Sequence, residues 1–157
     1  MTGVQTCALP IFAVPDDLDG RFEMVTLHSG LVLRRLSALG PIGAAISQDL
    51  VDYVFQGFED ALREMSIGDA GVAKRMKSMA SAFNGRNKVY AEALAAHDLD
   101  ALAAALARNA YRATETAEAP RALAARAAGF AEALDSVTIE VFAEGRFRFP
   151  RTVGDVS

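Results

Sequence analysis

The sequence predicts an all-α protein, a single-domain helical bundle of about five to six helices. Of its 157 residues, 52% are hydrophobic, and much of that share is alanine, the residue with the highest helix propensity. Apolar residues recur at helical spacing in several successive segments. Only one short stretch, residues 136–145, is rich enough in β-branched residues to suggest a strand. These three observations favour a helical bundle with its own core.

The first helix is expected over residues 21–39 and at the centre of the bundle. Its apolar residues cover more than half of the helical circumference, as in a helix that is packed on several sides. The remaining polar strip consists of Glu23, Thr26, Gly30 and Arg34. Gly40-Pro41 then ends the helix, because the residue before a proline disfavours the α conformation.

A second helix is expected over residues 43–65, with one apolar side and one acidic side. The acidic side contains Asp49, Asp52, Glu59 and Asp60. These carboxylates lie opposite the apolar stripe, and no Glu-x-x-His pair accompanies them as it does in carboxylate-bridged metal bundles. The acidic side is therefore interpreted as a solvated surface and not as a metal site.

The loop SIGDAG separates the second helix from the third. We expect Gly68 to adopt a positive φ angle, which glycine tolerates, and Asp69 to cap the next helix with its carboxylate. The third helix is expected over residues 70–96, with an apolar stripe that includes Met79 and Phe83.

Two more helices and an ambiguous segment follow. His97 marks a break, and Asp98 is expected to cap a fourth helix that ends near residue 112. A polar linker leads to a fifth helix, with Pro120 in its first turn. Residues 136–145 fit either a strand or a short helix, and the helix is favoured because no other segment suggests a strand. The RFRFP stretch after it is expected to be extended.

Residues 1–11, MTGVQTCALPI, are excluded from the functional interpretation. Over their whole length they resemble the conceptual translation of a common short-read sequencing adapter, so we expect an assembly artefact. Residues 12–150 then form the helical domain, and residues 151–157 form a flexible tail. Cys7 is the only cysteine and lies in the expected artefact, so the domain is expected to have no disulfide or cysteine-bound metal.

The charge of the chain is unevenly distributed. The net charge is −4, but residues 63–90 contain six basic and two acidic residues, a local charge of +4 that leaves −8 elsewhere. Arg75 and Arg86 fall on one edge of the apolar stripe of the third helix. Lys74 and Lys77 fall on its solvated side. Guanidinium groups beside apolar surface suit a protein or RNA partner, and the alternative is solvated charge that bonds to the acidic second helix.

No catalytic or cofactor-binding pattern is found in the sequence. The glycines lack the spacing of phosphate-binding loops, and His28 has no nucleophile arrangement around it. His28 shares a face of the first helix with Arg35 and is interpreted as a buried, hydrogen-bonded polar residue, with ligand binding as the alternative. No apolar stretch approaches the ~20 residues of a transmembrane helix. The expectation is a non-enzymatic protein without a cofactor.

The sequence also contains four spaced stretches, DGRFEM, LHSGLVLRRL, REMSIGDAGVAKRMKSMASAFNGR and FRFP. Together, from about Val14 to Pro150, they resemble the ubiquinol–cytochrome c chaperone family. The resemblance implies an all-α, non-enzymatic factor that assists assembly of the cytochrome bc complex, respiratory complex III. It also implies a further helical segment before the VPD turn, so the chain is expected to be truncated where the adapter-derived leader stands. The family loop, Gly-Val-Gly-Asp, differs here in its first half and keeps Gly68 and Asp69.

The resemblance implies that the partner is newly made cytochrome b or another complex III subunit. The ribosome and a small partner protein are further candidates, because mitochondrial members of the family work with both. The expected location is the cytoplasm, with peripheral attachment at the inner membrane as an alternative. The second hypothesis is a general helical module that binds protein or RNA through the basic third helix. The candidate partner-binding residues are Arg35, Gly68, Asp69, Lys74, Arg75, Lys77, Met79, Phe83 and Arg86.

Overall fold

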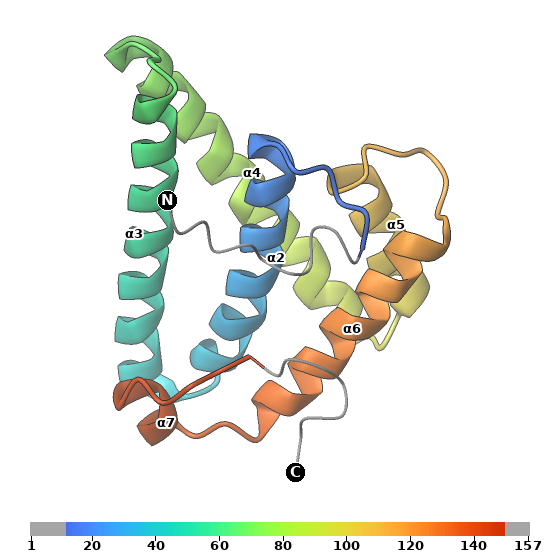
Figure 1. Cartoon of the computed structure of the whole chain (residues 1–157). Coiled ribbons are helices and arrows are strands. Elements are labelled where there is room, and N and C mark those ends of the chain that lie inside the picture. The colour runs from blue at the N-terminus through green and yellow to red at the C-terminus, as the bar shows by residue number, and fades with distance from the viewer. Residues whose placement is uncertain (1–11, 150–157) are drawn as a thin grey trace.

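The computed structural model describes residues 12–149 and contains six helices in that range. They are α2 (Leu18–Ser37), α3 (Gly40–Glu64), α4 (Asp69–Ala95), α5 (Leu99–Asn109), α6 (Glu118–Asp135) and α7 (Ile139–Ala143). No strand is present within residues 12–149, so the prediction of an all-α bundle is confirmed (Figure 1). The predictions of an artefact at residues 1–11 and of a flexible tail at 151–157 lie outside the described residues.

Helix α2 lies at the centre of the bundle, as its wide apolar circumference predicts. It contacts α3, α4 and α6, and Figure 1 shows it between α3 and α6 with α4 behind it. Four of its large side chains are almost completely buried, namely Met24, Leu27, Leu31 and Leu36. They belong to the main core, which α2 shares with α5 and α6. Because α2 is covered on three sides, it fixes the positions of its neighbours.

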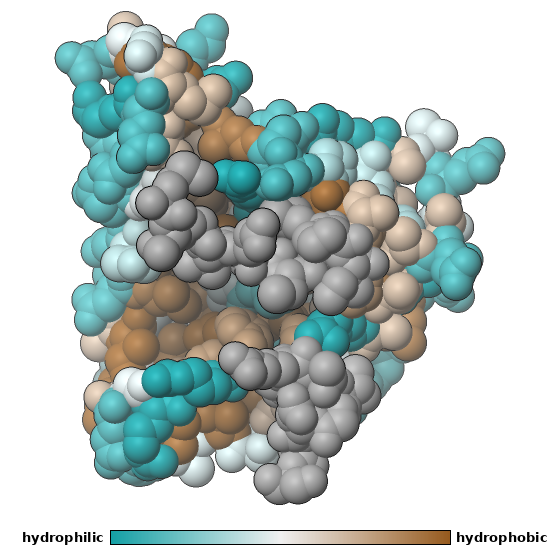
Figure 2. All heavy atoms as spheres, in the orientation of Figure 1, coloured by the Kyte–Doolittle hydropathy of each residue, from teal (hydrophilic) through white to brown (hydrophobic). Residues whose placement is uncertain are grey.

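A second apolar cluster joins α2, α3 and α4 through the buried rings of Phe22, Phe58 and Phe83. Phe55 extends it, with its ring centroid 5.3 Å from that of Phe83 in an edge-on arrangement. Phe58 and Leu62 are the two large side chains of α3 that are buried. Figure 2 shows hydrophilic residues along the outer side of α3 and hydrophobic residues between α3 and α2. Helix α3 is therefore peripheral and is held mainly by its aromatic side.

The polar strip of α2 contributes to the contact with α4. Glu23 is only 5% exposed, and its Oε2 accepts a hydrogen bond from Arg86 Nε at 2.6 Å. Thr26, one turn further along α2, is completely buried. Gly30 lies against Asn87, since a Cβ added at Gly30 would be 2.0 Å from Asn87 Oδ1. The two helices thus approach closely along a polar seam, with glycine where a side chain has no room.

The turn between α3 and α4 differs from the expectation at two residues. The left-handed backbone lies at Ser66, with φ 58°, directly after the C-cap of α3. Gly68 is instead extended, with φ −66° and ψ 157°, and is the N-cap of α4. The predicted positive φ of Gly68 and the predicted cap role of Asp69 are therefore wrong, because the chain has already reversed at Ser66. Asp69 begins α4 and accepts a hydrogen bond from Arg63 Nη1 at 2.7 Å across the turn.

Other predicted features are confirmed. Asp98 is the N-cap of α5, and its carboxylate accepts a backbone hydrogen bond of 2.8 Å from the first turn. His97 lies at the break before it, with a positive φ of 53°. Pro120 lies in the first turn of α6. Residues 136–145 contain α7, so the helical alternative is confirmed, and residues 146–149 follow without regular structure.

The backbone at two glycines predicts opposite responses to serine. Gly40 has φ 73°, where a side chain is strained, whereas Gly68 has φ −66° and open space around its Cβ position. Gly40→Ser should lower the free energy of unfolding by about 1–2 kcal/mol, the cost of left-handed backbone for an L-residue. Gly68→Ser should cost nothing, because serine is a preferred N-cap residue. Urea unfolding of both variants gives the two free energies of unfolding. An equal loss in both variants would mean that Gly68 is left-handed as well as Gly40.

The Glu23–Arg86 ion pair predicts a pH-dependent loss of stability when the arginine is removed. Burial raises the pKa of Glu23, and Arg86 opposes that shift. In Arg86→Met the carboxylate stays buried without its partner, which should cost about 3 kcal/mol at pH 8. A raised pKa in the folded state destabilises above the unfolded-state pKa of 4.5 and has no effect well below it. The loss should therefore shrink from pH 8 to pH 5.

The control is Glu23→Gln combined with Arg86→Met, which removes the buried negative charge together with the guanidinium. This double variant should be more stable than Arg86→Met at pH 8, and its advantage should decline at pH 5. Urea unfolding of the unsubstituted chain and of both variants at the two pH values gives the six free energies that are needed. A loss for Arg86→Met that is identical at both pH values would show that Glu23 is not a buried charge.

Candidate functional site

A cavity of about 410 Å³ lies between the N-terminal part of α2, the middle of α4 and the end of α5. Its charged lining consists of Arg75, Arg86, Arg108, Arg112, Asp19 and Glu23. Its apolar lining consists of Leu18, Phe22, Met79 and Ala82. Four positive and two negative side chains give the lining a charge of +2. The volume is in the range of ligand pockets, although six of the twelve lining residues are charged, a larger share than in a typical ligand pocket.

Two of the lining residues, Glu23 and Arg86, are fixed by each other. The Arg86 side chain is 25% exposed and that of Glu23 is 6% exposed, so their 2.6 Å ion pair is largely removed from water. The Arg86 guanidinium also lies 5.5 Å from the centroid of the Phe22 ring, within the range of a cation–π contact. Arg86 thus forms part of the wall, and its charge is mostly compensated within the protein.

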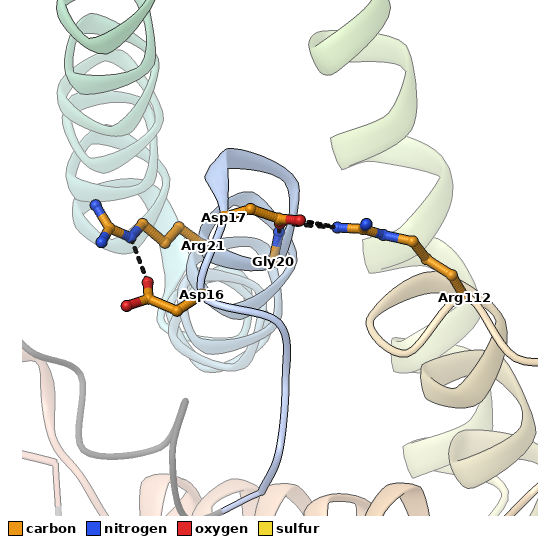
Figure 3. A network of polar contacts seen from close by, with 5 residues as sticks. All are labelled: Asp16, Asp17, Gly20, Arg21 and Arg112. Atoms are coloured by element: carbon orange, nitrogen blue, oxygen red, sulfur yellow. Dashed lines mark hydrogen bonds and ion pairs between the residues drawn. The ribbon is translucent and has the colours of Figure 1, made fainter.

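A second arginine of the lining, Arg112, is bound to the start of α2 (Figure 3). Its Nη2 donates to both carboxylate oxygens of Asp17, at 2.7 and 2.8 Å. Asp17 is also the N-cap of α2, where it accepts a hydrogen bond of 2.8 Å from Gly20 N. These bonds, that from Arg112 first, lower the pKa of the Asp17 carboxyl. Asp16 and Arg21 form a separate ion pair of 2.8 Å beside them.

The other two arginines of the lining, Arg75 and Arg108, are exposed. Within residues 12–149 neither of them forms an ion pair. They belong to different helices, α4 and α5, and meet at the same cavity. The cavity therefore combines two arginines that are held by the protein with two that are available to an anionic group. Guanidinium groups bind carboxylates and phosphates through two parallel hydrogen bonds.

The structure distributes the predicted partner-binding residues over several places. Arg75, Met79 and Arg86 meet in the cavity, as their common edge of the third predicted helix suggests. Lys74 and Lys77 are exposed on α4 but do not line the cavity.

The other candidates lie apart from the cavity lining. Phe83 is only 3% exposed and belongs to the aromatic cluster. Gly68 and Asp69 lie at the α3–α4 turn, and Arg35 lies near the other end of α2.

His28 and Arg35 make hydrogen bonds to backbone carbonyls, which supports the structural interpretation. His28 Nδ1 lies 2.8 Å from the carbonyl oxygen of Met24, and its ring contacts those of Phe130 and Phe149 at 6.0 and 5.5 Å. Burial lowers the pKa of His28, the expected direction for an imidazole among apolar rings. Arg35 Nε donates to the carbonyl of Val137 at 2.9 Å and so holds the segment after α6.

Sequence reasoning missed Arg108 and Arg112, although both line the cavity. Their spacing of four residues places them one turn apart at the end of the fourth predicted helix. That spacing indicates a pair of arginines on one side of the predicted helix, but it does not show that the end of α5 lies beside the middle of α4. The contact depends on the packing of α4 against α5, which only the fold reveals.

The acidic side of α3 is exposed and shows no metal site. Asp52 and Asp60 accept hydrogen bonds from Gln48 and Gln56, one turn earlier on the same helix. Throughout residues 12–149 no group of three or more His, Cys, Asp or Glu side chains could hold a metal ion. In that same part of the chain, no helix is both long enough and apolar enough to cross a membrane. The chemistry available in the cavity is recognition of an anionic, partly apolar group.

Comparison with known proteins agrees with this architecture. The family model described as ubiquinol–cytochrome C chaperone matches residues 11–149. Among solved structures, the crystal structure of the Cbp3 homolog from Brucella abortus is similar, with a TM-score of 0.82. That chain is 38% identical, and the alignment covers 94% of this chain and 81% of that chain. A comparison with curated proteins gives no match. The chain belongs to the ubiquinol–cytochrome c chaperone family.

Proposed function

We propose that this chain is an assembly chaperone of the cytochrome bc complex that holds newly made cytochrome b. The observation that carries the proposal is the family match over residues 11–149, supported by the similarity to the Cbp3 homolog. A chaperone of this kind binds a client and releases it, so the proposal assigns no catalytic residue and no cofactor. Because cytochrome b is a membrane protein, the chaperone would act in the cytoplasm, as a peripheral protein at the inner membrane.

The proposed client surface is the arginine cavity and the adjoining side of α4. Arg75 is exposed and Met79 is half-buried in the cavity, so both are available to a client. Lys74 and Lys77 extend the positive charge along the exposed side of α4. Arg86 supports the surface from within, because it is held by Glu23. Charge and apolar surface side by side suit a polypeptide segment that has both kinds of side chain.

The remaining candidates support this surface or lie apart from it. Phe83 positions α4 through the aromatic cluster and is not available to a partner without unfolding. Gly68 and Asp69 are exposed at the α3–α4 turn and would suit a second contact, to a small partner protein or the ribosome. Arg35 is proposed to act indirectly, by holding the carbonyl of Val137.

The pairing of charges favours a protein partner over RNA. Two of the six basic residues in 63–90 are held in ion pairs, Arg63 with Glu59 and Asp69, and Arg86 with Glu23. The charge left for a phosphate backbone is therefore smaller than the sequence window suggests. RNA binding depends on many unpaired cations, whereas a lining that combines charged and apolar side chains also offers contacts to the side chains of a peptide.

Site-specific photocrosslinking tests this proposal. A photoreactive amino acid at Ser78, which lines the cavity, should capture newly made cytochrome b in respiring cells. The matched control is the same amino acid at Asn84, which is exposed on α4 but does not line the cavity. Capture should be several-fold stronger at Ser78. Recovery of other proteins but no complex III subunit from Ser78 would refute the proposed function, and equal capture at both positions would refute the proposed surface.

A further inference from the structure

We infer that the cavity recognises a carboxylate on an acidic peptide segment, and that Arg75 and Arg108 are the residues that bind it. Both arginines line the cavity, and they belong to different helices. The inference rests on the proposed function only in assigning the peptide to a subunit of the cytochrome bc complex. The chemistry of recognition follows from the cavity itself.

The first step of the inference is that two of the four arginines in the cavity lack a counter-ion. Arg86 is paired with Glu23 at 2.6 Å, and Arg112 is paired with Asp17 at 2.7 Å. Arg75 and Arg108 have no such counter-ion within residues 12–149. Asp19 is the remaining carboxylate of the lining, so with both ion pairs neutral, Arg75, Arg108 and Asp19 leave an excess of one positive charge. A bound carboxylate would reduce this excess.

The two paired arginines connect the walls of the cavity to α2, which is the second step of the inference. Arg86 is bound to α2 through Glu23, and Arg112 is bound to α2 through the Asp17 cap. Helix α4, which bears Arg75, and the segment just after α5, the helix that bears Arg108, are thus both connected to α2 near the cavity. Two guanidinium groups on fixed helices lose less conformational entropy on binding than groups on mobile loops. The arrangement therefore favours a small anionic group that both arginines reach together.

The shape and apolar part of the cavity decide the class of ligand. A volume of about 410 Å³ accommodates one or two side chains. Phe22, Met79 and Ala82 provide apolar contacts for the residues beside the carboxylate, and the Ser78 hydroxyl provides a further hydrogen-bonding group. A membrane surface or an RNA duplex offers anions without apolar side chains next to them. An acidic residue with apolar neighbours in an extended segment matches the volume of the cavity, its apolar lining and its hydrogen-bonding groups.

The test measures binding of the purified full chain to immobilised 12-residue peptides that tile the segments of cytochrome bc complex subunits outside the membrane. Peptides that bind should contain Asp or Glu, and replacing that residue by Asn or Gln should weaken binding about tenfold or more. Arg75→Gln with Arg108→Gln should weaken binding of the same peptides by a similar factor. Melting of this variant should be unchanged, because neither arginine is part of an ion pair within residues 12–149.

The matched control is Lys88→Gln with Arg148→Gln, which removes the same charge from exposed residues that lie outside the cavity and outside the proposed client surface. It should change binding less than threefold. If the arginine variant has a lower melting temperature, the Glu→Gln exchange in the peptide still tests whether binding needs the carboxylate, since that exchange leaves the chaperone unchanged. Binding that does not depend on peptide carboxylates would overturn the inference, as would no binding of any peptide.

Two further arms of the experiment offer the cavity a lipid surface and an RNA in place of a peptide. Vesicles of phosphatidylcholine with phosphatidylserine, and a tRNA, are tested with the same variants. Loss of vesicle or tRNA binding in Arg75→Gln with Arg108→Gln, with peptide binding unchanged, would overturn the inference in favour of that anion. If cytochrome b is captured at Ser78 but no acidic peptide binds, the inference fails and the proposed function stands. If acidic peptides bind but no complex III subunit is captured, the proposed function fails and the carboxylate site stands.

Discussion

A buried ion pair between Glu23 and Arg86 determines how α2 and α4 lie against each other. A carboxylate that is 5% exposed tolerates burial only with a partner, and Arg86 is that partner at 2.6 Å. The pair fixes the register of the two helices, and in that register Gly30 lies against Asn87. It also holds the Arg86 guanidinium near the Phe22 ring, at the edge of the aromatic cluster that attaches α3. The ion pair with α4 and the aromatic contact with α3 and α4 thus lie next to each other on α2, at Glu23 and Phe22.

The cavity is a consequence of this arrangement. With Arg86 held by Glu23 and Arg112 held by the Asp17 cap, α4 and the end of α5 are both connected to the start of α2. Arg75 and Arg108 line the space between them. Arginines that look equivalent in the sequence therefore have different roles. Arg86 shapes the wall, whereas Arg75 is available to a partner, and a charge count along the chain does not distinguish them.

Features that depend on local sequence were predictable, and features that depend on packing were not. The helix N-cap Asp98 and the central position of α2 follow from residues that are neighbours in the chain or on one helix. Glycine's tolerance of left-handed backbone predicts that conformation at Gly68, but the structure has it at Ser66, where α3 ends. The partner of Arg86 is 63 residues away, and no sequence pattern links the two. Arg108 was missed for the same reason.

Hydrogen–deuterium exchange of the chain, with and without newly made cytochrome b, is the most direct test of whether the cavity framed by Glu23 and Arg86 receives the client. Bound client should slow exchange in the segments around the cavity, residues 18–23, 75–86 and 108–112. The outer side of α6, which does not border the cavity, should exchange at the same rate in both states. Protection confined to α3 and α7, with unchanged exchange around the cavity, would contradict the account.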